Sequence, residues 1–209
     1  MGQQEYDHWS LNQSVKKIEG FNARELNDKE KELISKANPT KILDIGCGNG
    51  KRLFSFLETI NVGYIGIERF QRLAEDSPYK SKIMIASVLE VDKSNPEFKN
   101  VDCVVILGGT LNGIFGYDNH RLAWNNIIDI LQINGKVIFD ALIIDGFDDN
   151  EIGERQIIPN VTPRQYFLTE KQLKKIWEKL KVQIIETIDW TIPAPFKRFK
   201  LRYYLLEKT

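Results

Sequence analysis

The chain has 209 residues, 42% of them hydrophobic, and its 29 Lys plus Arg are balanced by 29 Asp plus Glu. This apolar content is enough for a sizeable core, and the neutral balance gives no overall field that would favour nucleic acid or an anionic membrane. No apolar run approaches the roughly 20 residues of a membrane span, the start of the chain has no hydrophobic signal core, and the two cysteines lack metal or disulfide spacing, so we expect a cytoplasmic protein without a metal.

Residues 1–38 precede the first clear motif and form a polar, helix-prone stretch. We expect helices here. The side chains that stand out in this stretch are Tyr6, His8, Trp9 and Arg24.

An apolar run at 41–45 leads into three alternating glycines, Gly46, Gly48 and Gly50. Glycine adopts backbone conformations with positive φ and lets the backbone approach a ligand closely. The run therefore predicts a strand followed by a turn that lies against a bound molecule.

A second apolar run, 63–67, ends at Glu68. A nucleotide site in an open α/β sheet places a carboxylate for ribose hydroxyls about 20 residues past its glycine turn. The pair indicates a cofactor that contains a nucleoside. The dinucleotide fingerprint needs a further glycine where this chain has Lys51, so a pyrophosphate site is less favoured.

Further along, short apolar runs alternate with segments of helical period, which predicts parallel βαβ units. The expected strands are 41–45, 63–67, 82–85, 102–107 and 135–140. Helices are expected to begin after Gly50, after Arg69, near Asn119 and at Thr169, where Gln172 completes a capping box. The runs 181–188 and 198–206 predict an antiparallel hairpin, because apolar and polar residues alternate in the second run.

Two later segments stand at positions where a parallel sheet holds its ligands. Ser87 and Val88 follow the third expected strand, and Leu107 leads the fourth into Gly108 and a glycine-rich loop that also contains Asn112. Ligands bind outside the carboxyl ends of strands in open α/β sheets. The acidic segment 145–155 follows the fifth expected strand and has no clear period, so we expect an inserted loop, which is either a solvated surface loop or a lid that contributes to acceptor specificity.

The motif Asp-x-Gly-x-Gly-x-Gly, which begins at Asp44, followed by a strand that ends in Glu68, resembles the first two motifs of class I S-adenosylmethionine-dependent methyltransferases. The resemblance implies a Rossmann-like α/β fold with a seven-stranded, mostly parallel sheet, a C-terminal antiparallel strand and helices on both faces. It implies one methyltransferase domain, 1–209. Within it, 1–38 would form an N-terminal helical cap, 39–140 the cofactor-binding core, and 141–209 the acceptor loop with the last helix and hairpin.

The resemblance also implies which residues would contact S-adenosylmethionine. Glu68 would accept hydrogen bonds from both ribose hydroxyls, and Arg24 would pair with the methionine carboxylate. Ser87 stands where the family often has an Asp for the adenine amino group, so that contact stays open. The full expected set is Trp9, Arg24, Asp44, Gly46, Cys47, Gly48, Gly50, Glu68, Ser87, Val88, Leu107 and Gly108.

The expected reaction is transfer of the methyl group to an oxygen or nitrogen of a small-molecule acceptor. The cofactor already carries an activated methyl group, so the enzyme mainly aligns and desolvates the reactants. A base would help a hydroxyl acceptor, and the candidates are His8, His120, Tyr117 and Asp140. The alternatives are methylation of protein or RNA, and a non-catalytic module that binds the cofactor. No nucleic acid or membrane partner is expected.

Overall fold

The structure is a computed structural model that describes residues 25–75, 77–144, 153–156, 164–191 and 199–209. Four of the side chains singled out in the sequence, Tyr6, His8, Trp9 and Arg24, therefore lie outside the described residues, as does most of the acidic segment 145–155.

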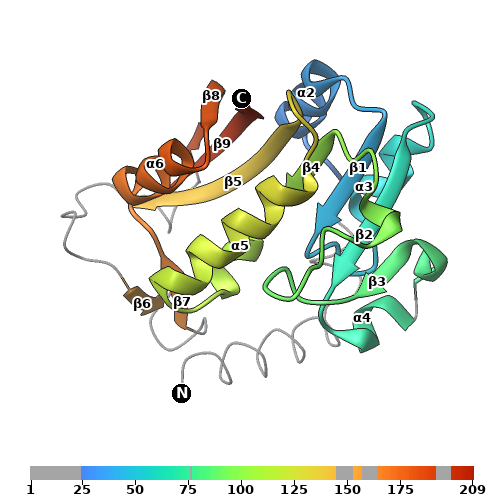
Figure 1. The fold of residues 1–209 in the computed structure, drawn as a ribbon, viewed down its shortest axis with the longest axis horizontal. Coiled ribbons are helices and arrows are strands. Elements are labelled where there is room, and N and C mark those ends of the chain that lie inside the picture. The colour runs from blue at the N-terminus through green and yellow to red at the C-terminus, as the bar shows by residue number, and fades with distance from the viewer. Residues whose placement is uncertain (1–24, 76, 145–152, 157–163, 192–198) are drawn as a thin grey trace.

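A seven-stranded sheet with the order β3-β2-β1-β4-β5-β9-β8 forms the centre of the protein (Figure 1). The first four pairs are parallel, and β9 is antiparallel to both β5 and β8. This arrangement confirms the predicted mostly parallel sheet with a reversed C-terminal strand. The strands are β1 Lys41–Ile45, β2 Gly63–Glu68, β3 Ile83–Ile85, β4 Cys103–Ile106, β5 Lys136–Ile144, β8 Val182–Thr191 and β9 Phe199–Lys208.

Helices precede β1, connect the parallel strands and precede the hairpin of β8 and β9. The α-helices are α2 Asp28–Ala37, α3 Lys51–Leu57, α4 Gln71–Glu75, α5 Tyr117–Ile130 and α6 Glu170–Lys179, and the short 3₁₀ helices are η1 Lys80–Lys82, η2 Pro96–Phe98 and η3 Thr110–Gly113. The predicted capping box at Thr169 is confirmed, because Thr169 accepts from the Gln172 amide and Gln172 accepts in return. A second capping box, Asn27 with Glu30, starts α2. Among the described residues, no helix is long and apolar enough to cross a membrane.

The sheet separates two apolar clusters, since successive side chains of a strand point to opposite faces. On one face, Ile42 and Val105 pack with residues of α2 and α3. On the other, Leu43 and Val104 pack with residues of α5 and α6. The two faces are therefore covered by helices, as predicted (Figure 1).

Several predicted strand boundaries differ from the structure, most by one to three residues. Strand β5 continues to Ile144, beyond the predicted end at 140, because β9 pairs with it along that whole length. Strand β3 starts one residue later than predicted, because residues 80–82 form η1. Part of the predicted acceptor loop is regular, since β6 Gly153–Gln156 pairs antiparallel with β7 Arg164–Phe167 in a separate two-stranded sheet.

Candidate functional site

The three glycines after β1 form the predicted turn. Gly46, Gly48 and Gly50 have φ values of 71°, 58° and 73°, in the left-handed region that favours glycine. A Cβ atom at Gly46 would also overlap the side chain of Thr110, the first residue of η3. The turn therefore brings the end of β1 into direct contact with the loop that follows β4.

Glu68 ends β2 and faces the glycine turn. One of its carboxylate oxygens accepts from the Gly48 amide at 2.9 Å, and the other accepts from the Phe70 amide at 2.9 Å. Burial raises the pKa of this carboxyl, while backbone hydrogen bonds from Phe70, Gly48 and Arg69 oppose the shift. A carboxylate has about four acceptor sites, and the three amides use three of them. The geometry thus leaves acceptor capacity for one ribose hydroxyl.

Asp44 is the next-to-last residue of β1, shortly before the glycines, and is almost fully buried. It accepts a hydrogen bond from the Tyr64 hydroxyl at 3.1 Å. Burial raises the pKa of Asp44 to about 7, against the opposing effects of Tyr64 and Arg52. A cation bound beside Asp44 would stabilise its ionised form, because opposite charges favour ionisation.

Cys47 packs tightly against β2. A Cβ atom at Gly66 would lie 2.6 Å from Cys47 Sγ and 2.9 Å from the Tyr64 hydroxyl, so the strand needs glycine there. Burial raises the pKa of the Cys47 thiol well above its usual value. The thiol is therefore a neutral group that packs against β2.

The loop after β4 is held by Asp140 of β5. Its carboxylate oxygens accept from the Gly108 amide at 2.7 Å and from the Gly109 amide at 2.9 Å. Burial raises the pKa of Asp140, and these two backbone hydrogen bonds oppose the shift. Asp140 therefore positions this loop, and its role as a candidate base stays a prediction.

Arg52 and Glu30 form a buried ion pair that the sequence did not reveal. An Arg52 guanidinium nitrogen lies 2.5 Å from a Glu30 oxygen, and Glu30 also accepts from the Tyr203 hydroxyl at 3.1 Å. A Cβ atom at Gly108 would lie 3.2 Å from Arg52 Nη1, so the guanidinium borders the loop after β4. The available signal was only Arg52's place in the first turn of α3, directly after the glycines.

Other predicted cofactor residues lie along the same edge of the sheet. Leu107 is buried directly after β4, and Val88 is buried after β3, where its carbonyl accepts from Asn126 of α5 at 2.8 Å. The half-buried Ser87 hydroxyl accepts from the Leu89 amide at 3.2 Å and so shapes its own turn. Strand pairing places Ile45 beside Ile67, so the turns after β1 and β2 meet at the carboxyl edge.

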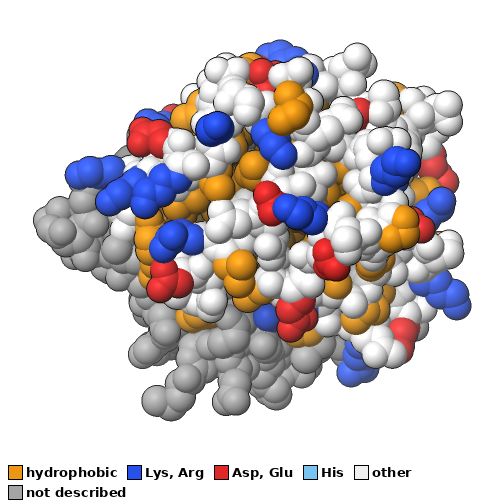
Figure 2. All heavy atoms as spheres, viewed as in Figure 1, with side chains coloured by type: hydrophobic (Ala, Val, Ile, Leu, Met, Phe, Trp, Pro, Cys, Tyr) orange, Lys and Arg blue, Asp and Glu red, His pale blue; other side chains and the backbone are white. Residues whose placement is uncertain are grey.

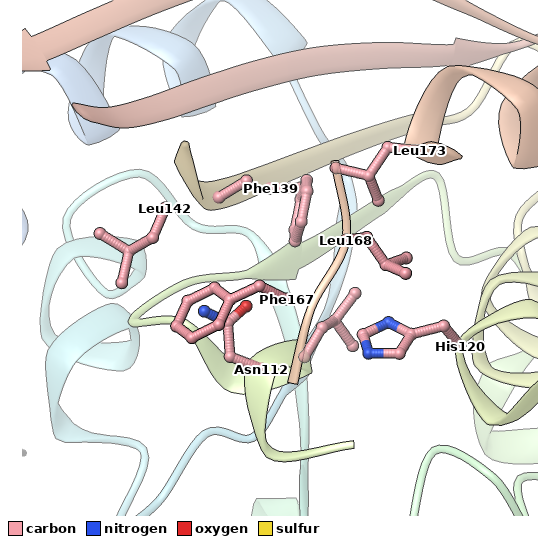
Figure 3. A pocket seen from close by; sticks show the side chains of 9 residues that line it. Asn112, His120, Phe139, Leu142, Phe167, Leu168 and Leu173 are labelled. Carbon is pink, nitrogen blue, oxygen red and sulfur yellow. The ribbon is translucent and has the colours of Figure 1, made fainter. Parts of the chain in front are cut away.

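Two candidate bases lie on α5. Tyr117, its first residue, is half-buried. His120, one turn later, is 3% exposed and lines a small cavity together with Asn112 of η3 (Figure 3). The structure therefore brings His120 and Asn112 together, which the sequence reasoning did not anticipate. The described residues include no cluster of three or more His, Cys, Asp or Glu suited to a metal ion.

No protein-family model matches the sequence, and neither does any curated protein. Solved structures do match the fold. The structure of the Burkholderia thailandensis 1,6-didemethyltoxoflavin-N1-methyltransferase, with bound 1,6-didemethyltoxoflavin and S-adenosylhomocysteine, is 15% identical over 97% of this chain and 84% of that chain, with a TM-score of 0.66.

Two further matches bind the same kind of cofactor. An amino pentose methyltransferase from Micromonospora echinaspora, bound to S-adenosylmethionine, is 12% identical over 95% of this chain and 97% of that chain, with a TM-score of 0.62. The magnesium protoporphyrin IX methyltransferase from Synechocystis, also with the cofactor bound, is 13% identical over 99% of this chain and 84% of that chain, with a TM-score of 0.58. The chain therefore has the fold of class I S-adenosylmethionine-dependent methyltransferases.

Proposed function

We propose that the protein transfers a methyl group from S-adenosylmethionine to an oxygen or nitrogen of a small-molecule acceptor. The observation that carries the proposal is the Glu68 carboxylate, held against the glycine turn by the Gly48 amide and still able to accept a further hydrogen bond. A ribose hydroxyl can donate that bond, and the fold is one used for methyl transfer.

The other groups at this edge fit the methionine part of the cofactor. The glycine turn and the loop at Gly108 allow close backbone approach. Asp44 offers a buried carboxylate near the turn, which suits an ammonium group, and Arg52 offers a cation, which suits a carboxylate. When bound, the cofactor supplies a methyl group on a cationic sulfur, and the chain's own residues hold the reactants in line and exclude water.

A small molecule is the acceptor that the observations favour. The three compared methyltransferases act, by their names, on a didemethyltoxoflavin, an amino pentose and a porphyrin. The face that carries α5 has basic and acidic side chains interspersed (Figure 2), and such a surface does not attract a polyanion as a basic patch does. Methylation of a protein or RNA is the alternative, and methyl incorporation into macromolecules rather than metabolites would select it. The cytoplasmic location stays a prediction.

The test is calorimetric binding of S-adenosylmethionine and S-adenosylhomocysteine to the wild type and to Glu68→Gln. The variant keeps the shape but loses the charge and one acceptor oxygen, so we expect roughly tenfold weaker binding of both. Glu58→Gln, a change at an exposed residue after α3, is the matched control and should bind as the wild type does. Thermal unfolding of the free variants separates lost contacts from lost structure.

Binding of a nicotinamide dinucleotide in preference to S-adenosylhomocysteine would overturn the proposal in favour of an oxidoreductase. Binding of S-adenosylmethionine without turnover against broad pools of metabolites and macromolecules would instead support the non-catalytic module.

A further inference from the structure

A small cavity lies beyond the glycine-rich loop, between β5, the end of β7 and the start of α5. It is lined mostly by apolar side chains and is partly open to the outside, with room for about one water-sized group (Figure 3). The side chains around it come from five elements or their ends and are Leu111, Asn112, His120, Phe139, Ala141, Leu142, Phe167, Leu168 and Leu173.

The two polar side chains of this cavity have buried atoms without hydrogen-bond partners among the described residues. These atoms are Nδ2 of Asn112 and both ring nitrogens of His120. Asn112 is 7% exposed and His120 is 3% exposed. In Figure 3 the imidazole points from α5 into the cavity. Leaving a buried polar group unsatisfied costs about 1–3 kcal/mol, so a site that retains two of them is a candidate for binding a polar group.

The cavity adjoins the proposed cofactor site through a continuous set of contacts. Thr110 packs against Gly46 of the glycine turn, and Asn112 lies two residues later in the same short helix. The ring of Tyr166 in β7 lies beside that of His120, with centroids 5.3 Å apart and planes tilted by 31°. A molecule that reaches between Asn112 and His120 would therefore lie beside the turn that holds the cofactor.

The chemistry of the cavity selects the group that it can receive. Burial lowers the pKa of His120 to about 4, with a smaller opposing effect of the Ile114 backbone, so the ring is neutral at pH 7 and has one acceptor nitrogen. Asn112 Nδ2 is a donor. A hydroxyl group both donates and accepts, and so satisfies both partners at once. A carboxylate, phosphate or ammonium would find no opposite charge among the lining side chains.

We propose that this cavity is the acceptor subsite and that it binds the hydroxyl of an uncharged, apolar acceptor such as a phenol, with the hydroxyl donating to His120 and accepting from Asn112. The proposal rests on the proposed methyltransferase function, and it narrows the acceptor class. Because the cavity has room for about one water-sized group, only the hydroxyl would enter it, and the remaining apolar part of the acceptor would stay at its open side.

The experiment uses the full chain in a His8→Gln background, which leaves His120 as the single histidine. The protein is saturated with S-adenosylhomocysteine and titrated with phenol and with toluene, which has the same shape but no hydroxyl. Imidazole nitrogen shifts by NMR report contact with His120, and the shift curves give both affinities. We expect phenol to move the ring signals and to bind about tenfold more tightly than toluene.

Asn112→Leu should abolish the preference for phenol over toluene while it leaves the affinity for S-adenosylhomocysteine unchanged. Asn119→Leu makes the same change at an exposed position on α5 and should keep the preference. Equal affinities for phenol and toluene, or no shift at His120, would overturn the hydroxyl subsite and leave the proposed function standing. Failure of the folded wild type to bind S-adenosylhomocysteine would instead remove the proposed function and, with it, this subsite.

Discussion

The edge of the sheet at the glycine turn and the cavity beside it differ in how their polar groups are satisfied. At the turn, Glu68 accepts from the backbone amides of Gly48, Arg69 and Phe70, and Asp140 accepts from two amides of the loop after β4. In the cavity, Asn112 and His120 retain buried polar atoms without partners among the described residues. Backbone amides already position the carboxylates of the first region, whereas the second region holds buried polar atoms that an added group would satisfy. The proposed cofactor site and the proposed acceptor subsite thus lie side by side, as a two-substrate transferase requires.

The largest effect is expected at the turn, from Gly46→Ala. The new Cβ would sit at a φ of 71° and would overlap Thr110. Left-handed strain of about 1–2 kcal/mol adds to overpacking of about 1–3 kcal/mol, so we expect a loss of about 4 kcal/mol of unfolding free energy. Urea unfolding followed by circular dichroism measures it.

Gly109→Ala is the matched control for this change. Its φ is 70°, nearly the same, but the nearest atom to a new Cβ is Asn112 Nδ2 at 3.9 Å. Gly109→Ala should therefore lose only the unfolding free energy that corresponds to backbone strain, about 1–2 kcal/mol. Equal losses in the two variants would show that the contact between the glycine turn and η3 does not matter, and the proposed link between the two regions would fail.

The next largest change in unfolding free energy concerns His120 in the cavity and depends on pH. The pKa of His120 is lowered from 6.5 to about 4 by burial, so between these values the unfolded chain binds a proton that the folded chain does not. The contribution of the neutral ring is complete above pH 6.5 and decreases as the pH falls towards 4. As the pH falls from 6.5 to 4, the unfolding free energy of the wild type should decrease by about 3 kcal/mol more than that of His120→Gln.

Unfolding free energies of both proteins at several pH values, in the His8→Gln background, measure this difference. Parallel stability curves between pH 7.5 and 4 would mean that the ring is hydrated in the folded state. His120 would then not be a buried neutral partner for a hydroxyl.

The smallest loss of unfolding free energy is expected from Asp140→Asn, which tests whether this carboxylate holds the loop after β4. The amide keeps one acceptor oxygen for Gly108 or Gly109 and presents N–H to the other, which leaves one donor unsatisfied. Relief from burying a carboxylate offsets part of the cost, so we expect a loss of about 1–2 kcal/mol. Thermal unfolding measures it, and faster hydrogen exchange at the Gly108 and Gly109 amides should accompany it. Unchanged exchange would contradict the positioning role of Asp140.

Local features were predictable where a short stretch of sequence determines the backbone. The glycine turn after β1, the place of Glu68 at the end of β2 and the capping box at Thr169 all depend on residues close together in the chain. The β6–β7 hairpin was not predicted, because its strands are short and lie beside segments without a clear period.

The sequence by itself determined the alternation of strands and helices, the reversed last strand and the glycine turn with its acidic partner, because backbone conformation and the period of apolar residues are encoded locally. Only the tertiary structure decided which distant side chains share a site. It paired Arg52 with Glu30, used Asp140 to hold a loop, and placed His120 beside Asn112, with buried nitrogens that no other described residue satisfies. The physical reason is that burial and the partners available after packing set the charge and hydrogen bonding of these groups, and neither is written in the neighbouring residues.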